Sequence, residues 1–190
     1  AWHYLFLPKK CLPPLIPIAA LQTVKTSHVY HSGSSARRSN PFWTTVSKPG
    51  IKHKISTFRG SENDVLKRFV DAVKNDNSNL IVRLTADCPL IDPKLIDKII
   101  NVYQKKKVDY LSNVENRTFP DGMDIELFSF EALSLANSLV KSNFDKEHVT
   151  SYFLRSNKFN KFNFEKKGEN YSNLRITLDT PQDFQLIKKI

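Results

Sequence analysis

The stretch Leu80-Ile81-Val82-Arg83-Leu84-Thr85-Ala86-Asp87-Cys88-Pro89-Leu90-Ile91-Asp92-Pro93 contains the end of one structural element and the beginning of the next. Residues 80–85 are short, branched and apolar, which is typical of a strand that is buried on both faces. Asp92 followed by Pro93 is the pattern of a helix N-cap with a proline in the first turn. The stretch therefore predicts a buried strand, a loop and a helix.

The same alternation continues on both sides of this stretch. Apolar residues recur at helical spacing from Val65 to Val73, and Ser61 with Asp64 forms a plausible capping box, which predicts a helix at about 62–76. This rhythm predicts an α/β fold, Rossmann-like, with a mostly parallel sheet flanked by helices. The further elements expected are strands at 108–112, 123–128, 160–166 and 173–178, helices at about 130–141 and 146–155, the latter capped by Asp145, and a helix from Pro181 onward.

Composition and length limit the class of protein. The 190 residues suffice for one compact α/β domain. No apolar run is long enough to span a bilayer, so no membrane helix is expected. Cys11 and Cys88 form neither a disulfide framework nor a metal-ligand spacing, which indicates a reducing, cytoplasmic compartment.

The net charge of +10 is concentrated near the N-terminus. Residues 1–57 contain 8 Lys or Arg and no Asp or Glu, whereas residues 58–190 are nearly balanced. A balanced charge is expected of an enzyme that acts on small molecules, and we expect no nucleic-acid partner.

Residues 1–57 differ from the remainder in other ways too. They could be a targeting peptide, a nucleic-acid-binding arm or sequence foreign to the fold, and the third interpretation is favoured. This region has two candidate strands. Tyr4–Leu7 is short and is ended by Pro8, and Leu15–Leu21 contains Pro17, so neither is expected to be a central strand. We expect irregular chain at about 22–55 and an α/β domain over 58–190.

Two carboxylates follow predicted strands. Ligands of open α/β sheets bind beyond the carboxyl ends of the strands, and Asp87 follows the strand 80–85 while Asp179 follows the strand 173–178. Such a pair suits Mg²⁺, which binds one or two carboxylates together with phosphate oxygens. The alternative is that each Asp caps the next helix, and for Asp179 both interpretations are equally well supported, because Asp-Thr-Pro-x-Asp is also a good helix start.

Six segments in order resemble one family. They are Phe58-Arg59-Gly60-Ser61 to Asp64-Val65-Leu66 with Arg68, Arg83-x-Thr85-x-Asp87-x-Pro89-Leu90-x-Asp92-Pro93, Asp109-Tyr110-x-Ser112-Asn113, Arg117-Thr118-Phe119-Pro120-Asp121-Gly122-x-Asp124-x-Glu126, Glu147-His148-Val149-Thr150, and Leu174-Arg175-x-Thr177-x-Asp179-Thr180-Pro181-x-Asp183-Phe184. Together they are more specific than any single short motif. They resemble the family of spore coat polysaccharide biosynthesis protein F, which is akin to the cytidylyltransferases that make CMP-sialic acid and CMP-Kdo.

The resemblance implies a nucleotide-diphosphosugar-transferase fold and a function. The expected reaction transfers CMP from CTP to a sugar or sugar acid with release of pyrophosphate, in surface polysaccharide or glycan biosynthesis. Mg²⁺ would bridge phosphate oxygens and be held by Asp87 and Asp179. CTP and the sugar are the expected partners. Related enzymes often dimerise, which makes a homodimer one candidate assembly, although the sequence itself does not give the oligomeric state.

The resemblance also implies a set of substrate-binding residues: Arg83, Arg117, Asp121, Gly122, Glu126, His148 and Arg175. Arg83 would face phosphate or support Asp87, or it is simply a paired arginine at a strand end. Arg117 and Arg175 would meet a sugar carboxylate, or each belongs to a structural ion pair. His148 would line the sugar side together with Asp121 and Glu126, or it is a hydrogen-bonded structural histidine.

One motif of the family is almost missing. Its first strand is normally followed by an Arg-x-Gly-Ser loop that wraps the triphosphate, and here only Leu7-Pro8-Lys9-Lys10 remains, with Lys10 in the place of the catalytic lysine. We therefore expect a truncated or frame-shifted relative with a fold that is incomplete at both ends. The alternative function is a catalytically incompetent fragment that acts only as a binding or relic domain.

Overall fold

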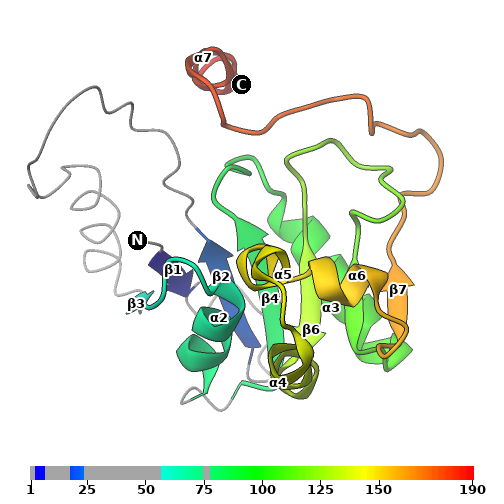
Figure 1. Ribbon diagram of the computed structural model, residues 1–190. Coiled ribbons are helices and arrows are strands. Elements are labelled where there is room, and N and C mark those ends of the chain that lie inside the picture. The colour runs from blue at the N-terminus through cyan, green and yellow to red at the C-terminus, as the bar shows by residue number, and fades with distance from the viewer. Residues whose placement is uncertain (1–2, 7–17, 24–56, 75–77) are drawn as a thin grey trace, which may run out of the picture.

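The computed structural model describes residues 3–6, 18–23, 57–74 and 78–190 (Figure 1). Within these ranges no helix is long and apolar enough to cross a membrane. The strands are β1 (His3–Phe6), β2 (Ile18–Thr23), β3 (Thr57–Arg59), β4 (Leu80–Thr85), β5 (Tyr110–Ser112), β6 (Glu126–Ser129) and β7 (Lys161–Asn163). They form one sheet in the spatial order β3-β1-β2-β4-β6-β5-β7.

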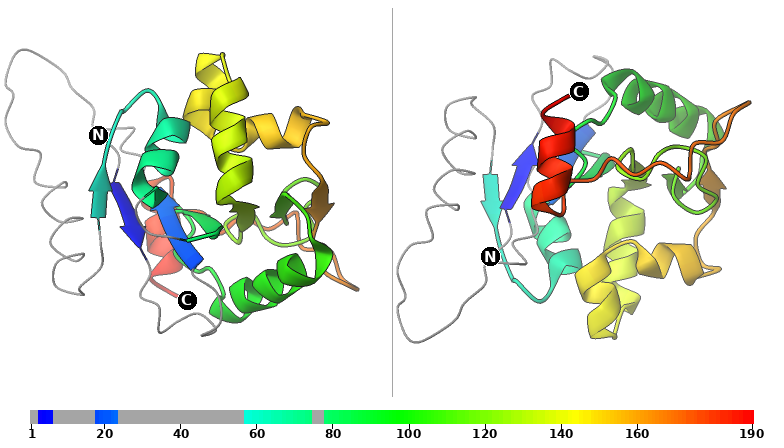
Figure 2. Two further views of the ribbon diagram at one scale, coloured as in Figure 1. Left: turned by 90° about the horizontal axis from the view of Figure 1, so that it is seen from below. Right: turned by 90° about the horizontal axis from the view of Figure 1, so that it is seen from above.

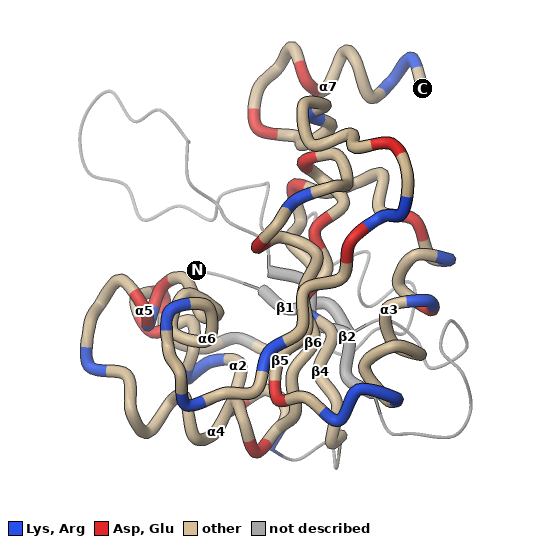
Figure 3. The backbone as a smooth tube through the Cα atoms, turned by 90° about the vertical axis from the view of Figure 1, so that its right-hand side faces the viewer, with Lys and Arg blue, Asp and Glu red and all other residues tan. Residues whose placement is uncertain are grey.

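Helices cover both faces of this sheet, and the α/β fold class is confirmed. The helices are α2 (Val65–Val73), α3 (Pro93–Lys106), α4 (Phe130–Leu139), α5 (Asn143–His148), α6 (Ser151–Arg155) and α7 (Pro181–Ile187). Figure 2 shows α3 on one face and α2, α4, α5 and α6 on the other. α7 has no buried residue, and Figures 1 and 3 show it standing apart from the sheet.

The sheet is more mixed than the sequence predicted. β2 pairs with β4 and β5 with β7 in parallel, whereas the other four adjacent pairs are antiparallel. Five strands share one direction, as expected, but β1 and β6 run the opposite way and both lie inside the sheet. Each reversed strand therefore makes both of its pairings antiparallel.

The apolar run of β4 is explained by its central position. Ile81 points to the core under α2 and α4, whereas Leu80, Val82 and Leu84 point to the core under α3. Since both faces of β4 are covered, its residues need not alternate with polar ones. The strand predicted at 80–85 is confirmed with the same bounds.

Stacked aromatic rings occupy the core on the α2 side of the sheet. The Phe153 ring lies 5.4 Å from the ring centroid of Phe128 and 5.3 Å from that of Tyr110, both in stacked geometry. The ring centroid of Phe159 lies 4.6 Å from that of Phe153, in a tilted arrangement. These rings fasten α6 to β5 and β6 through contacts that add to simple burial.

Helix caps follow local sequence rules with one correction. Asp92 caps α3 as predicted, because its carboxylate accepts the Lys94 N–H at 2.8 Å. The helix predicted at 62–76 begins later, after Asp64, whose carboxylate accepts the Lys67 N–H at 2.9 Å. Ser61, which was expected to be the cap, instead accepts the Asp64 N–H in the turn before the helix.

The single helix predicted at 146–155 is wrong. The chain forms α5 and α6 instead, separated at Val149, whose φ of 56° and ψ of −60° are incompatible with a helix. Ser142 caps α5, and Asp145 lies inside that helix rather than at its start. The strand predicted at 173–178 is also wrong: the only β pairing of this segment within the described residues is an isolated parallel bridge between Asp121 and Arg175.

The expectation that no central strand lies in residues 1–57 is wrong as well. β2 lies between β1 and β4 and pairs with β4 over its full length, from Ile18 opposite Leu80 to Thr23 opposite Thr85. Pro17 precedes the first residue of β2, so each residue of the strand has an N–H to donate. The irregular chain expected at about 22–55 falls, from residue 24 on, outside the described residues.

We predict that Phe153→Ala lowers the free energy of unfolding by about 3–5 kcal/mol, because it removes the ring at the centre of the aromatic stack and leaves a cavity. Phe144→Ala is the matched control, since that side chain is 60% exposed, and it should change the stability by less than about 1 kcal/mol. Urea denaturation of both variants measures the difference. Equal losses would contradict the assignment of the core.

Candidate active site

The loop after β4 places Asp87 beside a buried thiol. The Cys88 N–H donates to the Thr85 carbonyl at 3.2 Å, and the Thr85 hydroxyl and Cys88 sulfur are 3.0 Å apart. The Cys88 thiol also points to the Asp87 carboxylate, with sulfur and oxygen 3.7 Å apart. Burial raises the pKa of the Cys88 thiol to about 12, so it stays protonated and is no nucleophile at neutral pH.

A backbone hydrogen bond brings the second aspartate to this loop. The Leu178 N–H donates to the Asp87 carbonyl oxygen at 2.8 Å, immediately before Asp179 in the chain. Two more backbone hydrogen bonds hold the same segment a few residues earlier in the chain. The Asp121 N–H donates to the Leu174 carbonyl at 2.9 Å, and the Ile176 N–H donates to the Asp121 carbonyl at 2.8 Å. The structure therefore brings the backbones of Asp87 and Asp179 together beyond the end of β4, although 173–178 is not a strand.

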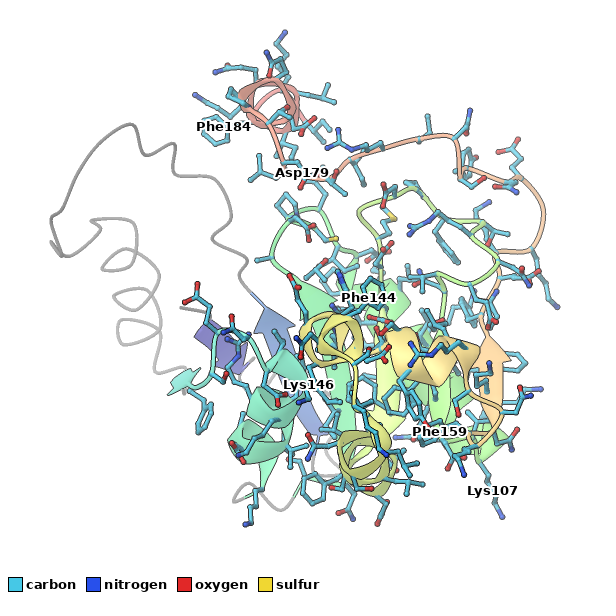
Figure 4. All side chains as sticks on the ribbon, in the orientation of Figure 1. Lys107, Phe144, Lys146, Phe159, Asp179 and Phe184 are labelled. Atoms are coloured by element: carbon cyan, nitrogen blue, oxygen red, sulfur yellow. The ribbon has the colours of Figure 1, made fainter. Side chains whose placement is uncertain are left out.

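Asp179 lies at the foot of α7 and is half exposed (Figure 4). One of its oxygens, Oδ2, accepts from Arg175 at 2.6 Å and from the Thr177 hydroxyl at 2.9 Å. It does not cap the helix: Thr180 does so, in a capping box with Asp183. The alternative interpretation, in which Asp179 serves as the N-cap of the following helix, is therefore wrong.

Arg83, which is partly buried, and Glu126, which is buried, form an ion pair across β4 and β6, where they are register partners. The Tyr110 hydroxyl on β5 donates to the other Glu126 oxygen at 2.5 Å. Burial and the adjacent carboxylate raise the pKa of Tyr110, so the hydroxyl remains a donor. This network ties three strands together below the loop of Asp87 and supports the interpretation of Arg83 as a paired arginine.

Arg117 is also paired. Its guanidinium donates to both carboxylate oxygens of Asp124, one at 2.9 Å, and lies 3.4 Å from an Asp121 oxygen. The hydrogen bonds to Asp124 raise the pKa of Arg117. The Asp121 carboxylate is half exposed.

Gly122 turns the chain where side chains would collide. Its φ is +107°, and a Cβ atom there would lie 2.9 Å from the carbonyl carbon of Ile176. Both the positive φ and the close approach of the Ile176 backbone therefore require glycine at this position. It allows the 121 and 175 backbones to form their bridge.

The contacts of His148 are separate from those of the residues described so far. It is exposed at the end of α5, and its ring centroid is 4.3 Å from that of Phe144. The next residue, Val149, is in a γ-turn closed by the Thr150 N–H on the His148 carbonyl, a conformation that is strained for a β-branched residue. No described contact joins His148 to the other predicted site residues.

A buried carboxylate holds the two helices on either side of this turn. Asp145 of α5 is fully buried and accepts from the Ser142 hydroxyl at 2.6 Å, the Ser151 hydroxyl at 2.7 Å and the Arg155 guanidinium. The hydrogen bonds from Arg155 hold the pKa of Asp145 well below its usual range. These contacts span from α5 to α6 and stabilise the γ-turn between them.

Several of these residues were not assigned a role from the sequence. Asp183 pairs with Arg175 at 2.8 Å, Asp124 with Arg117, and Tyr110 with Glu126. All three lie in the segments that resemble the family, and this was the one sign in the sequence that they matter. The spacing of residues along the chain does not predict which side chains they contact. Lys10, the predicted catalytic lysine, lies outside the described residues.

The carboxylates of Asp87 and Asp179 are the candidate ligands of Mg²⁺. The part of the chain that the structure describes has no cluster of three or more His, Cys, Asp or Glu side chains suited to a metal ion. Mg²⁺ does not require such a cage, because it keeps several waters and is commonly bound by one or two carboxylates and substrate phosphates. Asp87 and Asp179 fit that requirement.

Charges of both signs alternate along the segments between the sheet and α7 (Figure 3). Beyond the end of β4, the layered α/β domain thus carries two neighbouring segments that bear the carboxylates of Asp87 and Asp179. Residues 43–190 match the family model described as cytidylyltransferase, and the chain belongs to the cytidylyltransferase family. The match begins before Phe58, so the family's sequence extends further toward the N-terminus than the six segments indicated.

Individual relatives agree with this assignment. The chain is 38% identical over 134 residues to an uncharacterised protein of Methanocaldococcus jannaschii, covering 70% of this chain and 54% of that protein. It is 31% identical over 143 residues to the spore coat polysaccharide biosynthesis protein SpsF of Bacillus subtilis, covering 74% of this chain and 58% of that protein. The chain thus spans little more than half the length of these relatives.

A solved structure supports the fold. A cytidylyltransferase from Leptospira borgpetersenii superposes with a TM-score of 0.72 at 36% identity, covering 76% of this chain and 62% of that one. The resemblance noted from the sequence and the fold that it implied are both confirmed.

Gly122→Ala should lower the free energy of unfolding by about 2 kcal/mol or more, because the new methyl group combines an unfavourable φ with a backbone collision. Gly168→Ala is the matched control, since Gly168 has a similar φ of +91° but open space around it. The difference between the two, measured by chemical denaturation, isolates the collision with Ile176. A Gly122 variant as stable as the control would show that the 121 and 175 segments do not approach so closely.

Asp145→Asn should destabilise the protein at pH 7 by about 1–3 kcal/mol through weakened hydrogen bonds. Because the folded state lowers the pKa of Asp145, its carboxylate stabilises the fold above the unfolded pKa of about 3.9, and this is lost as the pH falls further. The stability gap between wild type and variant should therefore narrow below about pH 4. Urea denaturation from pH 7 to pH 3 tests this, and a constant gap would refute it.

Proposed function

We propose that this chain transfers CMP from CTP to a sugar or sugar acid and releases pyrophosphate. The observation that carries the proposal is the backbone hydrogen bond from Leu178 to Asp87, which brings the Asp87 and Asp179 segments together at the end of β4. Membership of the cytidylyltransferase family supports CTP as the nucleotide, and the name of the B. subtilis relative supports polysaccharide synthesis as the context.

The reaction is a substitution at phosphorus. The hydroxyl on the anomeric carbon of the sugar attacks the α-phosphorus of CTP and loses its proton, and the bond from that phosphorus to the oxygen shared with the β-phosphate breaks. Mg²⁺, when bound by Asp87 and Asp179, would neutralise the charge of the phosphate oxygens. The protein's own task is to fix the two substrates in line and keep the two carboxylates in place.

The remaining candidate residues divide into two groups. Glu126 is buried and saturated by Arg83 and Tyr110, so we assign it to the rigid support below the site rather than to the sugar. Asp121 is half exposed and suited to sugar hydroxyls. His148 is exposed as well, and its role in binding the sugar remains a proposal from the family resemblance.

Arg117 and Arg175 would have to leave aspartate partners in order to bind a sugar carboxylate. Their ion pairs therefore favour structural roles in the free protein. Lys10 is proposed to contact the triphosphate, in line with the resemblance of Leu7-Pro8-Lys9-Lys10 to the family's loop. Cys88, a free buried thiol, supports the proposal of a reducing, cytoplasmic compartment.

The second candidate function is that of a binding domain without turnover. It is favoured by the departure of residues 1–10 from the Arg-x-Gly-Ser pattern. Calorimetry with CTP separates the two: the enzyme should bind CTP with a dissociation constant in the range of about 1 μM to 1 mM that is usual for substrates. A domain that binds sugar but no CTP would support the second function.

The proposed activity predicts that purified protein releases pyrophosphate when given CTP, Mg²⁺ and a panel of sugars and sugar acids. Asp87→Ala and Asp179→Ala should each lower the rate by about 100-fold or more, because the charge on the phosphates is no longer neutralised. Asp71→Ala is the control, since this half-exposed residue of α2 pairs only with Lys67 among the described contacts. Full activity in both site variants would exclude the proposed metal ligands.

A further inference from the structure

Arg175 contacts two carboxylates at once. Its Nη2 atom lies 2.6 Å from Oδ2 of Asp179 and 3.0 Å from Oδ2 of Asp183, and its Nη1 atom lies 2.8 Å from Oδ1 of Asp183. The planar guanidinium makes this possible, because its donors are arranged as a fork. Arg175 thus links the proposed metal ligand to the first turn of α7.

The two partners of Arg175 are held differently. Asp183 is mostly shielded, with 14% of its side chain exposed, and it also accepts the N–H groups of Asp179 at 2.9 Å and Thr180 at 2.7 Å. It is therefore a fixed anchor. Asp179 is 52% exposed, and all the hydrogen bonds that its carboxylate accepts from described residues reach Oδ2. The other oxygen, Oδ1, accepts no hydrogen bond from a described residue and keeps its lone pairs for a further ligand.

We propose that Arg175 is a positioning residue that competes with the divalent cation for Asp179: it holds this carboxylate in the metal-free protein and withdraws toward Asp183 when the cation binds. This inference rests on the proposed function, since it takes Asp179 as a metal ligand. Arg175 would thereby set the affinity for the cation without touching either substrate.

Physical considerations support an exchange rather than a permanent pair. The contact between Arg175 and Asp179 is half exposed, and ion pairs in such surroundings are weak because water screens them. A guanidinium and a divalent cation on one carboxylate repel each other. Asp183 offers Arg175 a second, better shielded carboxylate, so the guanidinium keeps an ion-pair partner when it leaves Asp179.

The test measures the dissociation constant of Mn²⁺, taken as the probe for the site, by the electron paramagnetic resonance signal of free Mn²⁺ without CTP. Arg175→Gln should bind Mn²⁺ about 10-fold more tightly, because both the competitor and its charge are gone. Arg175→Lys keeps the positive charge. However, a single ammonium group that binds Asp183 does not reach Asp179 at the same time, as the forked guanidinium does. This variant should therefore bind Mn²⁺ about 3-fold more tightly than wild type.

Two further variants complete the design. Asp183→Asn retains an oxygen that accepts the backbone N–H groups but releases Arg175 to Asp179 alone, and it should weaken Mn²⁺ binding about 3-fold. Lys67→Gln removes an equal charge on α2, where Lys67 pairs with Asp71, and should leave Mn²⁺ binding unchanged. Circular dichroism before each titration confirms that the variants are folded.

The outcomes separate this inference from the proposed function. An Arg175→Lys variant with wild-type affinity would show that only the net charge matters, and would overturn the competition. Tighter binding in both Arg175 variants, with weaker binding in Asp183→Asn, would support it. If Asp179→Ala binds Mn²⁺ as wild type does, the metal assignment in the proposed function fails, and the inference fails with it.

Discussion

The hydrogen bond between the Leu178 N–H and the Asp87 carbonyl is the contact on which the candidate site depends. It joins the loop after the central strand β4 to a segment that approaches from beyond the edge strand β7. Because it uses only backbone groups, it brings Asp87 and Asp179 together without occupying either carboxylate. The bonds of Asp121 to Leu174 and Ile176 carry the same segment across the 117–125 loop, and Gly122 provides the close approach that they need.

The support below the site is rigid, and the residues above it are exposed. Glu126 is buried, and a buried carboxylate is tolerated only when it is paired and hydrogen-bonded, as it is by Arg83 and Tyr110. These residues come from three adjacent strands and fix the end of β4. Asp179 and Arg175, by contrast, lie in half-exposed surroundings where partners can be exchanged. A fixed support with exchangeable ion pairs above it suits a site that must bind and release charged ligands.

Local signals predicted well, and tertiary ones did not. The bounds of β4 and the cap of α3 followed from Leu80–Thr85 and Asp92-Pro93 because neighbouring residues decide them. The break at Val149 could not be foreseen, since it is stabilised by the buried contacts of Asp145. The segment 173–178 has a strand-like sequence but lies over loops instead of entering the sheet, and the central position of β2 depends on its pairing with β4. The six motifs identified the family, but the partners of Arg117 and Arg175 required the fold.

The most direct test of the account is the position of Mn²⁺ in crystals grown with CTP, determined from its anomalous scattering. If Asp87 and Asp179 hold the metal, a single strong peak lies at the end of β4, within about 2.5 Å of a carboxylate oxygen from each of these two residues. A metal ion bound only by the phosphates, or by other side chains while these two carboxylates remain apart, would contradict it.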